Sequence, residues 1–185
     1  WDTGSFQKLA SMDLREYTIE DIFVTAEGNL LITTSSTYDV LLCYGPDGTL
    51  LWKLENCVDM AFLGGRSEIL TLRNDYDQLQ EFTVLNAETG ETVEPPIPYA
   101  KQENGSMASR FLQTENRGDQ PIPVCFFAGN VNYIYLLDLQ SGDLREVMYV
   151  DTSFAAGSCS IDYAAVTDNG NLVVMRGDGS GIYNG

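Results

Sequence analysis

The chain has 185 residues, 44% of them hydrophobic, which is enough for a domain with a real core. Lys and Arg number 10 against 27 Asp and Glu, which gives a formal net charge of −17. This charge argues against binding nucleic acid or docking on an anionic membrane, and it suits cationic partners or metal ions. The apolar runs are far shorter than a membrane span, so no membrane insertion is expected.

Residue types also limit the chemistry. The chain has no His, which excludes Ser-His-Asp and Cys-His pairs and zinc sites with imidazole ligands. Cys43 and Cys125 lie in the apolar segments LLCY and VCFF and are predicted to be core thiols, and no cysteine spacing predicts a disulfide. The chain opens at Trp1 without an initiator Met, so we expect a processed or excised segment.

The first predicted unit covers residues 13–55. Its segment VTAEGNLLI turns at Gly28, and LLCYGPDGTLLW turns at Gly48, 20 residues later. Glycine suits both turns because hairpin turns of this kind require a positive φ. A single hairpin is only marginally stable in water, so each must pack on a neighbouring sheet.

The next two units repeat this arrangement. In residues 56–100 the turns fall at Gly65 and Gly90, 25 residues apart. In residues 101–150 they fall at Gly118 and Gly142, 24 residues apart, and the first of these is the less regular. The Pro-rich loop 94–105 is predicted to be an irregular insert. The period of roughly 40 to 50 residues, with four short strands in each period, predicts a repeat architecture.

The fourth unit covers residues 151–185 and is completed by residues 1–12. Its first turn, in VTDNGNLVV, falls at Gly170. The N-terminal WDTGSFQKLASM matches LDLQSGDLREVM, which puts Gly4 in the second turn position. Joining the two ends would place Gly4 19 residues after Gly170, close to the spacing in the first unit. Two alternatives stay open: the N-terminal strand closes a four-bladed ring, or the four blades belong to a larger propeller.

These repeats resemble the quinoprotein-like and WD40-like β-propeller families over nearly the whole chain. The shared pattern is G-x-L at the start of the second strand and D-x-x-[TS]-G between the third and fourth strands. The Trp that often ends the fourth strand in quinoprotein-type repeats occurs once, as Trp52, and the repeats lack the Trp-Asp ending of WD40 blades. The resemblance implies an all-β fold of about sixteen short strands in four four-stranded blades, forming a single propeller domain or propeller segment over 1–185.

The same strand assignment predicts a core between adjacent blades. Its members are apolar residues of the predicted strands: Leu42, Phe82, Val84, Ile134, Leu136 and Val173.

Three predicted first strands begin with an acidic residue. These are Asp21, Asp59 and Asp162, and the third blade has Ser109 instead. First strands line the channel of a propeller, so three carboxylates would converge there and could hold calcium through oxygen ligands. The alternative, which we favour, is that each Asp accepts backbone hydrogen bonds and fixes the entry to its strand. No other cofactor is expected.

Loops between the second and third strands are predicted on the same face as these acids. The first two share a Tyr-Asp pair, Tyr38-Asp39 and Tyr76-Asp77, and Tyr offers a rigid contact surface for a ligand. The alternative is that Tyr packs over the rim and Asp caps the loop.

The functional hypothesis is a non-catalytic β-propeller module that binds a protein or glycan, as part of a bacterial surface or secreted protein outside the cell. The first alternative is a carbohydrate-active enzyme that uses channel carboxylates. The second is a structural segment of a larger propeller, which would dimerise edge to edge if its ring is open.

Overall fold

The computed structural model describes residues 11–35, 39–74, 80–100, 102–113, 115–116, 120–151, 160–167, 169–177 and 182–184. Every helix or strand that it assigns in this part of the chain is a strand, and the sixteen strands form four antiparallel sheets. The predicted all-β fold with about sixteen short strands is therefore confirmed. The chain divides into two compact units, Trp1–Pro96 and Ile97–Gly185.

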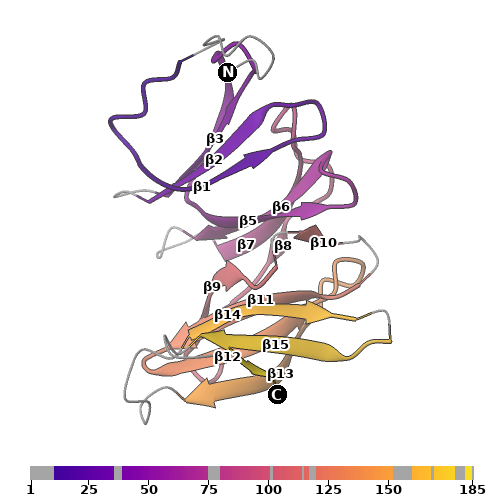
Figure 1. Cartoon of the computed structure of the whole chain (residues 1–185). Helices are drawn as coiled ribbons and strands as arrows, with labels where there is room; N and C mark the ends of the chain where they lie inside the picture. Colours follow the sequence, from indigo (N-terminus) through magenta and orange to yellow (C-terminus); the bar gives the residue numbers. More distant parts are fainter. Residues whose placement is uncertain are drawn as a thin grey trace. The chain divides into compact units, whose positions relative to one another are not determined.

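The first unit contains two sheets (Figure 1). The first sheet has the order β1 (Thr18–Val24), β2 (Leu30–Ser35), β3 (Val40–Tyr44) and β4 (Leu50–Glu55). The second contains β5 (Cys57–Leu63), β6 (Glu68–Asn74) and β7 (Gln80–Asn86), paired in that order. An isolated bridge joins Leu85 to Thr92 on the outer side of β7. Each sheet is thus a meander, in which strands that are consecutive in the sequence are neighbours.

The second unit repeats this arrangement. Its first sheet contains β9 (Met107–Phe111), β11 (Ile122–Ala128), β12 (Val131–Leu137) and β13 (Leu144–Asp151). Its second contains β14 (Ser160–Val166), β15 (Leu172–Gly177) and β16 (Ile182–Asn184). The two-residue strands of this unit are β8 (Ile97–Pro98) and β10 (Glu115–Asn116).

Glycine turns join the strands as predicted. Gly48, Gly90 and Gly142 have φ values of 85°, 71° and 74°. Gly28 and Gly170 have φ values of 87° and 76°. This left-handed backbone favours glycine over residues with a Cβ, which is why glycine recurs at these turns. Gly4 and Gly118 lie outside the described residues.

The core of the first unit lies between its two sheets. One face of the sheet β1–β4 packs against the sheet β5–β7, and we call it the front face of the first sheet. It carries Phe23, Leu31 and Cys43. The facing residues include Met60 and Phe62, and the rings of Phe23 and Phe62 meet edge to face with centroids 5.9 Å apart.

The opposite face of the sheet β1–β4 is its back face. Ile32, Val40 and Leu42 are buried there beneath Met12, Leu14 and Tyr17. The segment that precedes β1 therefore covers one end of this back face.

The core of the second unit also lies between two sheets. Leu112, Cys125 and Ile134 pack against Ile161 and Ala164 of β14. Leu172 and Val174 of β15 complete the back face of the sheet β14–β16. The two units thus use the same construction, in which one sheet buries a face against the face of the sheet that follows it in the sequence.

Most of the predicted core residues are buried: Leu42, Phe82, Val84, Ile134 and Leu136. The prediction for Val173 is wrong, because this side chain is 48% exposed. Alternation in β15 directs Leu172 and Val174 to the packed face, so Val173 lies on the opposite, front face of the sheet β14–β16.

Candidate functional site

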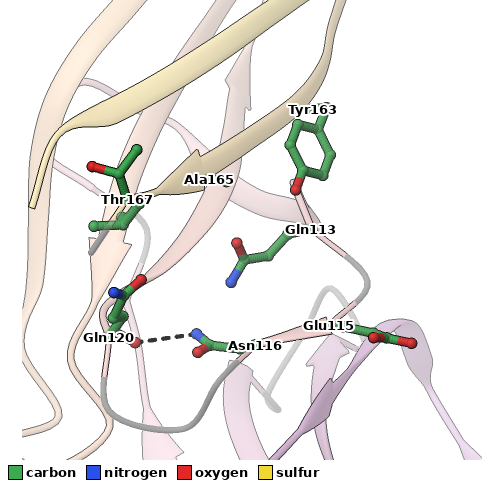
Figure 2. Close-up of a pocket in the computed structure, with 8 residues that line it drawn as sticks. Gln113, Glu115, Asn116, Gln120, Tyr163, Ala165 and Thr167 are labelled. Atoms are coloured by element: carbon green, nitrogen blue, oxygen red, sulfur yellow. Dashed lines mark hydrogen bonds between the residues drawn. The ribbon is translucent and has the colours of Figure 1, made fainter. Parts of the chain in front are cut away.

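A pocket of about 340 Å³ lies in the second unit. It is lined on one side by the segment that follows β9, and on the other by the end of β14 (Figure 2). The lining residues are Gln113, Glu115, Asn116, Gln120, Tyr163, Ala165, Val166 and Thr167. Ligand sites commonly have this size and a few convergent polar groups.

Gln113 is the most informative residue of this pocket. Its side chain is only 8% exposed, and Figure 2 shows its amide directed into the hollow between Asn116 and Tyr163. No hydrogen bond joins this amide to any residue that the structure describes. A buried amide normally has a hydrogen-bond partner, so this donor and acceptor are available to a molecule in the pocket.

The opposite wall is held in place by hydrogen bonding. Nδ2 of Asn116, a residue that is nearly buried, donates to the Gln120 carbonyl at 3.1 Å. The Glu115 carboxylate points away from these amides (Figure 2). The interior of the pocket is therefore lined mainly by neutral groups: amides, the Tyr163 phenol and the Thr167 hydroxyl.

The three acids predicted from the sequence lie on first strands next to irregularities in pairing. In β1 the register shifts between Ile19 and Asp21, and in β5 it shifts between Cys57 and Asp59. In β14 the shift falls between Ile161 and Tyr163. Asp21 and Asp59 therefore follow the extra residue of a β-bulge, whereas Asp162 is itself the extra residue. By this register Asp162 corresponds to Glu20 and Val58, and Ser109 occupies the same position in β9.

The bonds of these acids are local. The Asp21 amide donates to the Thr33 hydroxyl at 3.1 Å, and the Asp59 carboxylate accepts from the Met60 amide at 2.8 Å. For Asp59 this is the strand-entry role that the sequence offered as the alternative to a ligand site. The described residues contain no group of three His, Cys, Asp or Glu that could hold a metal ion. The side chain of Asp162 lies outside the described residues, so calcium at the three acids stays a prediction.

The predicted Tyr-Asp loops are described only at Asp39. Its carbonyl accepts from the Cys57 amide at 3.0 Å, which joins the end of one loop to the start of β5. Tyr38, Tyr76 and Asp77 lie outside the described residues.

Sequence reasoning missed Gln113, Asn116, Gln120 and Tyr163 as site residues. The segment FLQTENRGDQ follows an apolar strand and contains a turn glycine, so it has the composition of an ordinary loop. The one available signal was its irregularity, since this turn departs from the pattern of the other three units. The residues that the structure describes include no helix able to cross a membrane.

Comparison with known proteins identifies the fold. No protein-family model and no curated protein sequence matches the chain. Among solved structures it is similar to the C-terminal WD40 domain of Sif2, with 14% identity and a TM-score of 0.53 over 96% of this chain and 47% of that one. It is similar to a protein of unknown function from Bacteroides caccae, with 15% identity and a TM-score of 0.53 over 91% of this chain and 56% of that one.

A weaker similarity connects it to the exotype rhamnogalacturonan lyase YesX, with 16% identity and a TM-score of 0.48 over 88% of this chain and 39% of that one. The chain spans about half the length of the first two chains. Together with the meandering sheets, these similarities show that the chain consists of WD40-like β-propeller blades.

Proposed function

We propose that this chain is a non-catalytic binding module whose ligand is a neutral glycan, held in the pocket of the second unit. The observation that carries the proposal is Gln113, an amide that is 8% exposed and has no hydrogen-bond partner among the described residues. Leaving a buried amide unpaired costs roughly 1–3 kcal/mol. A ligand that pairs with this amide would recover that free energy.

The chemistry of the lining favours a glycan. Amide groups both donate and accept, as sugar hydroxyls do, and Gln113, Asn116 and Gln120 all line the pocket. The ring of Tyr163 adds an apolar surface for the C–H face of a sugar ring. A neutral ligand also avoids repulsion by a protein with a net charge of −17. We include an extracellular or cell-surface location in the proposal, because such a module would meet free and surface glycans there.

The test begins with a glycan array, followed by calorimetric titration of the glycan that binds best. We expect Gln113→Leu to weaken binding by at least tenfold. The same change should leave the free energy of unfolding unaltered or slightly larger, because it removes an unpaired buried amide. The matched control is Gln140→Leu, which changes an exposed Gln of the same unit outside the pocket.

Three results would contradict the proposal. One is that no glycan binds, and another is that both Gln variants bind as well as the parent. The third is turnover of a bound oligosaccharide that Asp59→Asn abolishes, which would favour the enzyme with channel carboxylates.

A further inference from the structure

We propose that two copies of this chain associate head to tail, with the front face of the sheet β14–β16 of one copy docked on the back face of the sheet β1–β4 of the other. The evidence comes from faces that the chain buries in one sheet and exposes in another. It is independent of the proposed glycan site.

The front face of the sheet β14–β16 is apolar and open. Tyr163, Val173 and Met175 are all classed as exposed large apolar residues. Register identifies what should cover them. Phe23 pairs with Leu31 one position before the first turn, and Ala165 pairs with Val173 at the same place. Leu31 is fully buried beneath the sheet β5–β7, whereas its counterpart Val173 is 48% exposed. The last sheet therefore has the front face of a blade without the covering blade.

The back face of the sheet β1–β4 shows the complementary exposure. Ile22 and Val24 of β1 and Leu50 of β4 are exposed there, Ile22 by 57%. The register makes Ala164 the counterpart of Ile22, and Ala164 is fully buried against the preceding sheet. The part of this back face beyond Met12, Leu14 and Tyr17 therefore lacks the covering that the fourth sheet has.

A polar contact repeats the same relation. At the first turn, the Thr25 hydroxyl and the Asn29 amide both donate to the Glu88 carboxylate of the second sheet, at 2.9 and 2.6 Å. Thr167 and Asn171 form an identical turn, in which the Asn amide N–H donates to the Thr hydroxyl at 3.1 Å in both cases. No carboxylate among the described residues accepts from these two side chains.

The first sheet of a second copy would bring the missing acceptor. Glu88 lies in the turn that ends at Gly90, and the corresponding turn of the first sheet, which ends at Gly48, carries the exposed Asp47. Docking of that sheet would place an acid near Thr167 and Asn171, as the second sheet does for Thr25 and Asn29.

A second copy also matches the size of the solved propellers. This chain covers 47% and 56% of the two chains to which it is most securely compared, so two copies supply about as much chain as one of them. Each copy carries a net charge of −17. Salt should therefore strengthen the association by screening the repulsion between copies.

The experiment is sedimentation velocity on the full chain at 0.15 and 0.5 M NaCl, with two face variants. Val173→Asp disables the front face, and Ile22→Asp disables the back face. Both residues are exposed and lie outside the pocket, so each variant should retain the parent melting temperature. The control is Val93→Asp, which changes a residue that is 47% exposed and lies on neither face.

We expect the parent and Val93→Asp to sediment at twice the chain mass of 20.4 kDa, and each face variant to sediment as a monomer. An equimolar mixture of the two face variants should recover a dimer, because it pairs one intact front face with one intact back face. A monomeric parent at both salt concentrations would overturn the proposal, and so would a mixture that stays monomeric. Dissociation by only one of the two face variants would indicate pairing of like faces, which also contradicts it.

Discussion

The thiol of Cys43 lies on the front face of the first sheet and is fully buried. Burial, with a smaller contribution from the nearby Glu88 carboxylate, raises the pKa of Cys43 from 9.0 to about 11. The unfolded chain therefore loses this proton first as the pH rises. The stability that the neutral thiol contributes is present below pH 9 and is lost between about pH 9 and 11.

We predict that above pH 9 the parent loses roughly 1.4 kcal/mol of unfolding free energy per pH unit through this thiol. Cys43→Ala should lack that contribution, although its stability at pH 8 falls because a buried side chain is shortened. Urea unfolding of both proteins from pH 8 to 10.5 measures the difference in slope. Parallel pH profiles would show that the thiol ionises equally in the folded and unfolded chains.

At the scale of single residues, the sequence predicts burial where apolar neighbours lie on both sides. Cys43 and Cys125 were predicted as core thiols from LLCY and VCFF, and both are buried. Val173 sits in the equally apolar NLVV and is exposed, because burial in a strand depends on which sheet covers each face. Gln113 has the sequence environment of a loop residue, and only the folded chain places β14 across a pocket from it.

At the scale of elements, one side chain ties the first two sheets together. Trp52 of β4 donates its indole N–H to the Glu88 carbonyl at 3.1 Å. Its ring lies so close to Gly90 that a Cβ added there would come within 2.8 Å of it. The φ of Gly90 is 71°, so this position both requires a left-handed backbone and leaves no room for a side chain.

We predict that Gly90→Ala destabilises the fold more than Gly28→Ala does. Both changes put a Cβ on a left-handed backbone, which costs roughly 1–2 kcal/mol. A Cβ at Gly28 meets nothing within 4 Å, whereas one at Gly90 displaces Trp52, and such overpacking adds about 1–3 kcal/mol. Thermal melting of the two variants measures the difference. Equal losses would mean that Trp52 moves aside freely and does not hold the sheets together.

The elements could be predicted because hairpin turns are local. Gly28, Gly48, Gly90, Gly142 and Gly170 mark turns in the sequence and have positive φ in the structure. The β-bulges could not be predicted, because they depend on how the first strand pairs with the second. Spacing in the sequence aligned Asp162 with Asp21 and Asp59, and the extra residue in each first strand moves it by one position.

At the scale of the whole molecule, the sheets follow one rule within each unit: the front of one sheet is covered by the back of the next. The predicted closure by residues 1–12 falls almost entirely outside the described residues and stays a prediction. The described faces, by contrast, are unequal, because Val173 and Ile22 are exposed where their counterparts Leu31 and Ala164 are buried. Repeat count could be predicted from the sequence, whereas the exposure of these two faces required the register.

The central claim, that the last front face accepts the first back face of another copy, can be tested by crosslinking. By register, Ala165 corresponds to Phe23 and Val24 to Phe62, and Phe23 and Phe62 are in ring contact between the first two sheets. In a Cys159→Ser background, Ala165→Cys and Val24→Cys are made in separate chains, mixed and oxidised. We predict a reducible dimer in the mixture, well above that from either variant alone. No more dimer in the mixture than in the separate variants would contradict head-to-tail docking.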